Sequence, residues 1–308
     1  MTKLRRKTPL FQSIEQLESR KLLAVASVVE NGLLKVTGDS DGPVEIVAKS
    51  SSQIEVTDNG ISIGTFDGVK SININLDTSG TANDVVTLKL DGASVDRVMA
   101  NLGGGDNSLV LATGSIKGSM SYKGGSGRDD LELAAGTTVG RNVYAMLGDG
   151  SNSLKTGAGI AGSLLVSGGG DKDTITILAE ATIGKSAGLS LGKGDNTVSV
   201  AGAIEQSLVL KAGDGNDIVT VETTGFVGRS VLASLGAGDN TLTHSGEIAG
   251  DLRVRSKTST DQVTVGADAI VGGNTVQRLG VGNGRDHDEG REHGKSKTPL
   301  TAAIRARR

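Results

Sequence analysis

The chain has 308 residues and a formal net charge of −3, with 47 Gly, 3 Phe, 2 Tyr and neither Trp nor Cys. So few aromatic rings exclude a wide globular core, whereas a narrow core of Val, Ile, Leu and Ala fits the composition. Without Cys, disulfides and thiol chemistry are excluded. The charge is uneven, because residues 1–21 carry +4 and residues 283–308 carry +3, which leaves −10 for residues 22–282. An acidic body with basic ends does not predict a nucleic-acid groove, which needs a basic face. It suits divalent cations or simple solubility.

Residues 1–29 are expected to form an export leader with a short amphipathic helix. The segment starts with basic residues and ends in an apolar run over residues 22–29. That run is too short to span a membrane. Charged residues at positions 15, 18, 20 and 21 precede it, which is unlike an ordinary secretory signal.

Within this leader, residues 11–24 (FQSIEQLESRKLLA) resemble the LEPR-XLL leader of exported planctomycete proteins. The family pattern is Leu-Glu-Pro-Arg-x-Leu-Leu. Residues 17–18 and 20–23 match it, while Ser19 stands where Pro is usual. The resemblance is confined to this segment. It implies export to the cell surface or the exterior, often of long repeat proteins, and it implies nothing about activity.

Residues 30–78 are predicted to form an N-terminal β cap and the first irregular coils. Alternating apolar and polar residues separated by Gly and Asp clusters indicate strands at 33–37, 44–47, 53–56, 61–63 and 72–76. A cap is needed at this end because the open end of a stack of strands is an unpaired sheet edge.

Residues 79–279 contain a repeat that is defined by one polar column. Asp and Asn alternate at steps of 21 to 23 residues, at Asp84, Asn107, Asp129, Asn152, Asp173, Asn196, Asp217, Asn240 and Asp261. A second column keeps the same beat at Val95, Ile116, Val139, Ile160, Ile183, Ile204, Val227, Ile248 and Val271. A fixed period of this length is typical of stacked repeats. The sequence therefore predicts an all-β fold, a single-stack β-solenoid (β-helix) of about nine coils.

Coils of 24 residues alternate with coils of 20 or 21, so the full unit is a pair of coils. Two geometries fit this pattern. Either each half is one turn of the solenoid, or the pair forms one larger turn; the first is favoured because both halves share the two columns. After Leu279 the pattern stops, and the polar, charged segment 280–308 is expected to be a disordered basic tail.

The alternating column has two interpretations. Its residues share the parity of the inward-facing apolar positions, so they should point inward and must be hydrogen-bonded there. Stacked Asp side chains about 5 Å apart would repel each other, whereas an Asn between them doubles their separation and supplies a donor. In this first interpretation the column is a hydrogen-bonded ladder that needs no metal.

The second interpretation is calcium binding. Residues 124–132 (GGSGRDDLE) fit the G-G-x-G-x-D-x-U-x nonapeptide of hemolysin-type (RTX-like) repeat proteins; residues 212–220 nearly fit, and residues 168–176 fit less well. This resemblance implies possible Ca²⁺ positions at Asp129, Asp173, Asp217, Gly125, Gly127, Gly213 and Gly215. The family carries two nonapeptides in tandem, whereas this chain has one in each long coil, and the outer copies at Asp84 and Asp261 lack the glycines.

No catalytic constellation is evident. The G-x-S-x-G match at 38–42 precedes no helix, and the G-x-G-x-x-G match at 157–162 lies within the repeat. We therefore expect an exported structural or surface repeat protein without catalytic activity, with cell-envelope or extracellular-matrix components as partners and with no nucleic acid and no membrane span. The alternatives are an RTX-like module that is stabilised by Ca²⁺ outside the cell, and a carbohydrate-active or carbohydrate-binding β-helix. His244 lies in the inward phase of a short coil and is expected to pack inside or at a turn.

Overall fold

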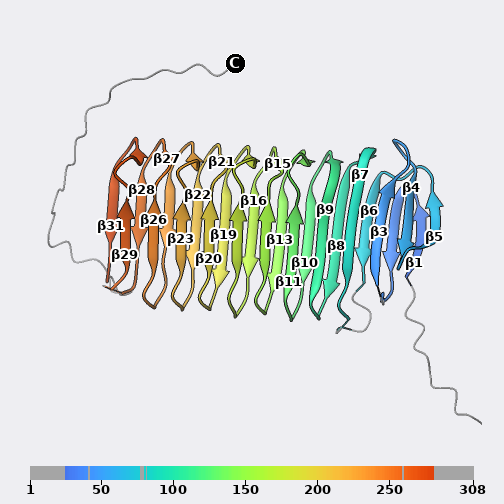
Figure 1. Ribbon diagram of the computed structural model, residues 1–308, viewed down its shortest axis with the longest axis horizontal. Helices are drawn as coiled ribbons and strands as arrows, with labels where there is room; N and C mark the ends of the chain where they lie inside the picture. Colours follow the sequence, from blue (N-terminus) through green and yellow to red (C-terminus); the bar gives the residue numbers. More distant parts are fainter. Residues whose placement is uncertain (1–24, 41, 77–79, 81, 259, 281–308) are drawn as a thin grey trace, which may run out of the picture.

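A computed structural model describes residues 25–40, 42–76, 80, 82–258 and 260–280, and these residues form 31 strands and no helix (Figure 1). The strands stack along one long axis as a β-solenoid, so the predicted all-β fold is confirmed. The expected leader helix and the expected disordered tail lie outside the described residues. Residues 26–29, which we placed in the leader, belong to the first strand.

One side of the solenoid is a single sheet of 12 strands. In spatial order its strands are β1 (Ala26–Glu30), β2 (Leu33–Thr37), β6 (Ser71–Asn75), β8 (Arg97–Gly103), β10 (Met120–Gly124), β13 (Val143–Gly148), β16 (Leu164–Gly168), β19 (Ala187–Gly192), β22 (Leu208–Ala212), β25 (Val231–Ser234), β28 (Leu252–Arg255) and β31 (Thr275–Arg278). We call this the first sheet. From β2 onward each strand pairs in parallel with the strand of the next coil.

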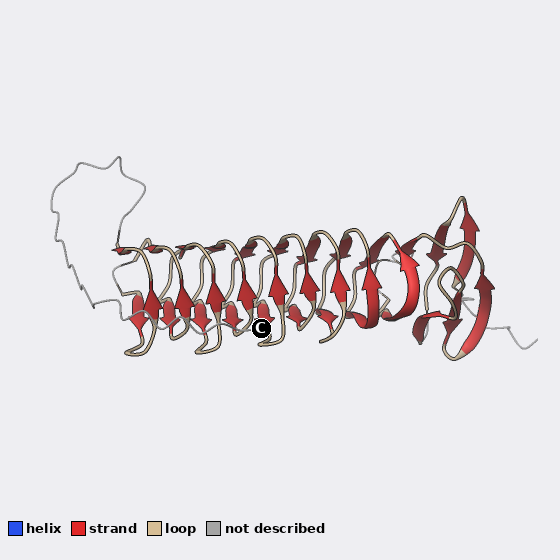
Figure 2. Cartoon of the chain, turned by 90° about the horizontal axis from the view of Figure 1, so that it is seen from above, coloured by secondary structure: helices blue, strands red, loops and turns tan. Residues whose placement is uncertain are grey.

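The remaining strands form the second sheet. Its longer strands are β3 (Pro43–Ala48), β4 (Ile54–Asp58), β5 (Ile61–Phe66), β7 (Val85–Val95), β9 (Asn107–Ile116), β11 (Asp129–Leu133), β14 (Ser153–Thr156), β17 (Thr174–Ile177), β20 (Thr197–Val200), β23 (Ile218–Val221), β26 (Thr241–His244) and β29 (Gln262–Val265). Two-residue strands follow them in each later coil: β12 (Thr138–Val139), β15 (Gly159–Ile160), β18 (Thr182–Ile183), β21 (Ala203–Ile204), β24 (Phe226–Val227), β27 (Glu247–Ile248) and β30 (Ile270–Val271). Figure 2 shows the coils following one another from above.

The register settles the length of one turn. Leu131 of β11 is paired with Leu109 on one side and with Leu154 on the other. Neighbours in the stack are therefore one long or one short coil apart in sequence. The turn of about 22 residues is confirmed, and the larger turn made from a pair of coils is wrong.

The N-terminal end is capped by antiparallel strands. β1 covers β2, and the hairpin β4–β5 covers β3, while β2 and β3 themselves pair in parallel with the next coil. Both hairpins turn at Asn-Gly pairs with positive φ, at Asn31-Gly32 and Asn59-Gly60. Such pairs close two-residue hairpins because both residues tolerate the left-handed region. The predicted cap is therefore confirmed, and β2 and β3 are also the first regular strands of the solenoid.

The core is one narrow column of apolar side chains along the whole stack. Val, Ile, Leu and Ala alternate with outward polar residues on each strand, as in the buried pattern of β17 and β20. Tyr122 is the largest fully buried side chain among the described residues. The narrow core of Val, Ile, Leu and Ala that was predicted from the scarcity of aromatic residues is therefore confirmed.

Candidate functional site

All nine members of the Asp/Asn column are buried, with exposed fractions between 0 and 5%. Each member lies at the start of a strand of the second sheet or directly before one, and its side chain points inward. The inward orientation predicted from the alternation is thus confirmed.

Hydrogen bonds link the column along the axis, and we call this linked column the polar ladder. The backbone N–H of one member donates to the side-chain Oδ1 of the member in the next coil. This occurs from Asp129 to Asn152 at 2.9 Å, from Asn152 to Asp173 at 3.2 Å and from Asp173 to Asn196 at 2.8 Å. The same bond continues from Asn196 through Asp217 and Asn240 to Asp261. From Asn152 to Asp261, each side chain therefore accepts a bond from the backbone of the preceding coil. Asn107 accepts one from Asp84 N in the same way, whereas the backbone N–H of Asn107 donates to Arg128 O and not to Asp129.

The Asn amide groups hold both the turn and the next carboxylate. Asn152 Nδ2 donates to Gly148 O at 3.1 Å, to Gly150 O at 2.9 Å and to Asp173 Oδ1 at 2.9 Å. Asn196 Nδ2 likewise meets Gly194 O and Asp217 Oδ1. A carboxylate has no donor for the turn carbonyls, so the Asn coils close their turns in a way that the Asp coils do not.

Burial changes the ionisation of the Asp members. Burial raises the pKa of the Asp129 and Asp217 carboxyls, and it raises the pKa of Asp173 to about 6, against hydrogen bonds from the neighbouring Asn that favour the charged form. Burial also acts on Asp261, but bonds from Ser256, Asn240 and Thr258 outweigh it, so its pKa is lowered. The central ladder therefore holds carboxyl groups that resist ionisation.

Each central carboxyl group also keeps one oxygen without a partner. Asp129 Oδ1, Asp173 Oδ2 and Asp217 Oδ2 are buried and accept no hydrogen bond from the described residues. The other oxygen of Asp129 accepts from Gly125 N at 3.1 Å, and the Tyr122 hydroxyl lies near enough to Asp129 to lower its pKa. An unpaired buried oxygen is costly, so these atoms call for a proton or a cation.

The glycines of the nonapeptide pattern serve the stacking of the turns. A Cβ on Gly125 would overlap Gly103 O, and one on Gly213 would overlap Gly192 O. Gly127 and Gly215 have φ of +116° and +141°, a region that side chains disfavour. The structure thus places Gly125 and Gly127 beside Asp129, and Gly213 and Gly215 in the turn before Asp217. It separates the three Asp residues from one another by Asn coils, and no group of three or more His, Cys, Asp or Glu in the described chain could hold a metal ion.

His244 is confirmed as an inward residue. It is fully buried at the end of β26, where its Nε2 lies 3.1 Å from Ile270 O. Burial lowers the pKa of its imidazole, so the neutral form is favoured.

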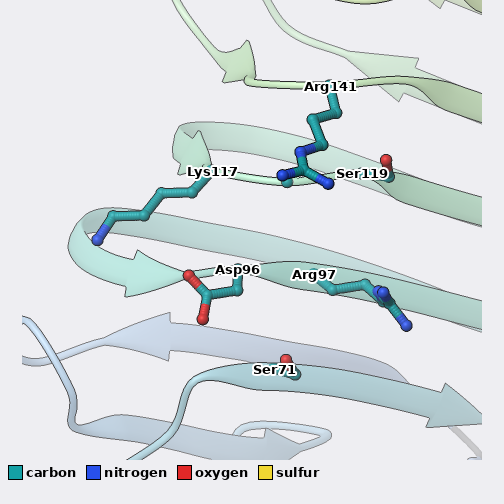
Figure 3. A pocket seen from close by; sticks show the side chains of 7 residues that line it. Ser71, Asp96, Arg97, Lys117, Ser119 and Arg141 are labelled. Carbon is teal, nitrogen blue, oxygen red and sulfur yellow. The ribbon is translucent and has the colours of Figure 1, made fainter.

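Sequence reasoning missed a basic pocket on the outside. It has a volume of about 340 Å³ and is lined by Ser71, Asp96, Arg97, Lys117, Gly118, Ser119 and Arg141. In Figure 3 the guanidinium of Arg141 lies over the coil that carries Lys117 and Ser119. The signal that could have found it is the 44-residue spacing of Arg97, Arg141, Lys185 and Arg229, the first two of which line the pocket.

Comparisons with known protein families, curated proteins and solved structures find no match. Among the described residues there is also no helix that could cross a membrane.

Proposed function

We propose that the chain is an exported structural repeat protein without catalytic activity, which acts as a rod at the cell surface or outside the cell. The observation that carries this proposal is the polar ladder. Its side chains are buried and bonded to the backbone of neighbouring coils, so they act on the stability of the rod and not on a substrate. Cell-envelope or matrix components are its proposed partners.

Export rests on the leader, whose residues 17–18 and 20–23 resemble the LEPR-XLL pattern. The test is fractionation of cells that express the full chain and a variant with Leu22→Asp and Leu23→Asp. We expect the unchanged chain at the surface or in the medium and the variant retained inside. Equal distribution of the two chains would contradict the proposal that residues 17–23 direct export.

An RTX-like, calcium-stabilised module is the second candidate. It is favoured by the unpaired buried oxygens of Asp129, Asp173 and Asp217, since carboxylate and carbonyl oxygens are the ligands of Ca²⁺. Against it stands the Asn coil between each pair of carboxylates, which already donates to one oxygen of Asp173 and of Asp217.

Thermal unfolding separates the two candidates. The full chain is melted with millimolar Ca²⁺ and with chelator, beside the variant Asp129→Asn/Asp173→Asn/Asp217→Asn. A ladder that needs no metal gives coincident curves, and the triple variant unfolds at an equal or higher temperature. A calcium ladder gives a midpoint that rises with Ca²⁺ and a rise that is lost in the variant. A carbohydrate-active β-helix remains a third proposal, and turnover of a polysaccharide by the full chain would favour it.

A further inference from the structure

A further column of residues, separate from the polar ladder and from the apolar column that starts at Val95, runs along the corner where each coil enters the first sheet. Its members are Asp96, Gly118, Arg141, Gly162, Lys185, Gln206, Arg229, Gly250 and Gly273. Backbone hydrogen bonds join them in register, as from Arg141 N to Gly118 O at 2.9 Å, from Gly162 N to Arg141 O at 2.9 Å and from Lys185 N to Gly162 O at 3.0 Å. We call this column the corner row.

The corner row presents one cation on every second coil. Arg141, Lys185 and Arg229 are exposed, and none of them takes part in an ion pair among the described residues. The residues between them are glycine or glutamine. Because neighbouring parallel strands are about 4.8 Å apart, the cations follow one another at about 10 Å.

The basic pocket continues this row at its N-terminal end. Asp96, Gly118 and Arg141 are the row members that line the pocket. Arg97, Lys117 and Arg141 supply three cations around it (Figure 3). Lys117 Nζ contacts Ser94 Oγ, and no ion pair among the described residues joins it to Asp96. The pocket therefore keeps an excess of positive charge although Asp96 is part of its wall.

The neighbouring first sheet has the same sign of charge. From β2 to β31 its strands contain no Asp or Glu, whereas they carry Lys35, Arg97, Lys123, Lys211, Arg253, Arg255 and Arg278. Arg253 is bound to Asp251 at 2.7 Å and Lys35 to Glu30 of β1 at 2.5 Å. Lys123, Lys211 and Arg255 are exposed and in no ion pair of the described residues. On the second sheet, by contrast, Asp130 and Glu132 face outward. A basic face on a chain of net charge −3 indicates an anionic partner.

Apolar side chains stand exposed beside these cations. Tyr144, Leu165, Val209 and Leu232 occupy one outward row of the first sheet, with exposed fractions of 37 to 44%. Gly188 interrupts the row, so the apolar contact is broken into short steps along the axis. Such steps suit the apolar faces of successive sugar rings.

We propose that the corner row and the outer face of the first sheet bind a linear acidic polysaccharide along the solenoid axis. A cation at about every 10 Å matches a polymer with sparse charge, whereas duplex DNA carries one charge per about 1.7 Å of its axis. Proteins that bind single-stranded nucleic acid stack its bases on a series of aromatic side chains. Tyr144 is the one aromatic residue that faces outward among the described strands of this sheet, which argues against that partner. Binding to a bilayer surface requires a continuous apolar face. Gly188 and Arg253 interrupt the outward apolar row of this sheet, which argues against a membrane.

The test is a binding titration of the full chain with immobilised hyaluronan and polygalacturonate, with dextran as the neutral polymer. The variant Arg141→Ala/Lys185→Ala/Arg229→Ala removes three positive charges from the corner row. The control variant Lys155→Ala/Lys172→Ala/Lys193→Ala removes three positive charges from positions outside the corner row and the first sheet. We expect binding to an acidic polymer that weakens with salt, a loss of roughly tenfold or more in the corner variant, and less than about twofold in the control.

Circular dichroism and unfolding midpoints verify that both variants keep the fold of the unchanged chain. Binding to neither acidic polymer, equal binding to dextran, or equal loss in both variants would overturn the proposal. Tighter binding to single-stranded DNA or to vesicles that contain phosphatidylglycerol would overturn it as well, in favour of that partner. None of these outcomes depends on export or on the structural role of the rod.

Discussion

Asn196 donates two hydrogen bonds to a single atom of Asp217: its backbone N–H and its Nδ2 reach Oδ1 at 3.0 and 2.9 Å. Asn152 bonds to Asp173 Oδ1 in the same way, at 3.2 and 2.9 Å. One carboxylate oxygen thus accepts hydrogen bonds from both the backbone N–H and the side-chain amide of the Asn in the preceding coil. The alternation of the column therefore has a chemical basis, since only the amide supplies the second donor.

Replacing the amide by a carboxylate should break the ladder. The variant Asn196→Asp places a third acid between Asp173 and Asp217 and removes the Nδ2 donor. We expect a loss of at least about 3 kcal/mol in the free energy of unfolding at pH 7, because an uncompensated charge is then buried. The matched control is Thr197→Asp, which adds the same charge on the outward side of β20. Urea unfolding that shows equal losses for the two variants would contradict the ladder.

Stability should depend on pH through the raised carboxyl pKa values. Between about pH 4 and the pKa of about 6 for Asp173, the folded chain binds more protons than the unfolded chain. The free energy of unfolding therefore falls as pH rises through this window, by about 2–3 kcal/mol for this residue. We expect Asp173→Asn to flatten the fall, measured as unfolding midpoints from pH 4 to 7. An unchanged slope in the variant would show that Asp173 is ionised at no cost.

His244 should act in the opposite direction. Its pKa is lowered by burial, so below about pH 6.5 the unfolded chain binds more protons and stability falls with falling pH. The variant His244→Val places in the column the residue type found at the paired positions Val221 and Val265. We expect the variant to gain stability relative to the unchanged chain at pH 5 and to gain less at pH 7.5. A difference that does not vary with pH would mean that His244 does not titrate in this range.

The residue five places before the ladder Asp should be critical in two coils and tolerant in a third. A Cβ on Gly124 would overlap Asp129 Oδ2, and one on Gly168 would overlap Asp173 Oδ2. The corresponding position before Asp217 is Ala212, which is 7% exposed. We expect Gly124→Ala to cost about 2–3 kcal/mol, as overpacking does, and Ala212→Gly to cost about 1 kcal/mol. If chemical unfolding gives equal costs, the carboxyl moves freely and the packing argument fails.

The ladder could be predicted from the sequence because two periods are visible in it. The alternation within a strand shows which residues face inward, and the repeat of about 22 residues shows which residues of neighbouring coils are paired. All nine residues from Asp84 to Asp261 are buried, and His244 lies inward as its phase required. The turn glycines have a role that the sequence did not indicate. Their assignment to possible Ca²⁺ positions stays a prediction, and the structure adds that Gly125 and Gly213 allow one turn to pack against the previous one. Periodicity shows that a glycine is needed, but not which neighbour needs the space.

The corner row escaped prediction for a related reason. Arg141, Lys185 and Arg229 repeat as regularly as the ladder, but Glu205 and Asp251 lie close by in the sequence. Only the register of the turns shows that Gln206 and Gly250 occupy the row itself. The net balance of charge along the sequence therefore concealed a sheet whose strands from β2 to β31 carry no acidic residue.

The alternation of Asp and Asn also governs how such a rod can change its length over evolutionary time. Loss of a single coil, such as residues 192–211, would remove Asn196 and bring Asp173 and Asp217 into adjacent layers. Loss of residues 168–211 removes one Asp and one Asn together and leaves the order intact. We therefore expect duplication and deletion in even numbers of coils, that is, in steps of 44 codons. This spacing already separates Asp129, Asp173, Asp217 and Asp261.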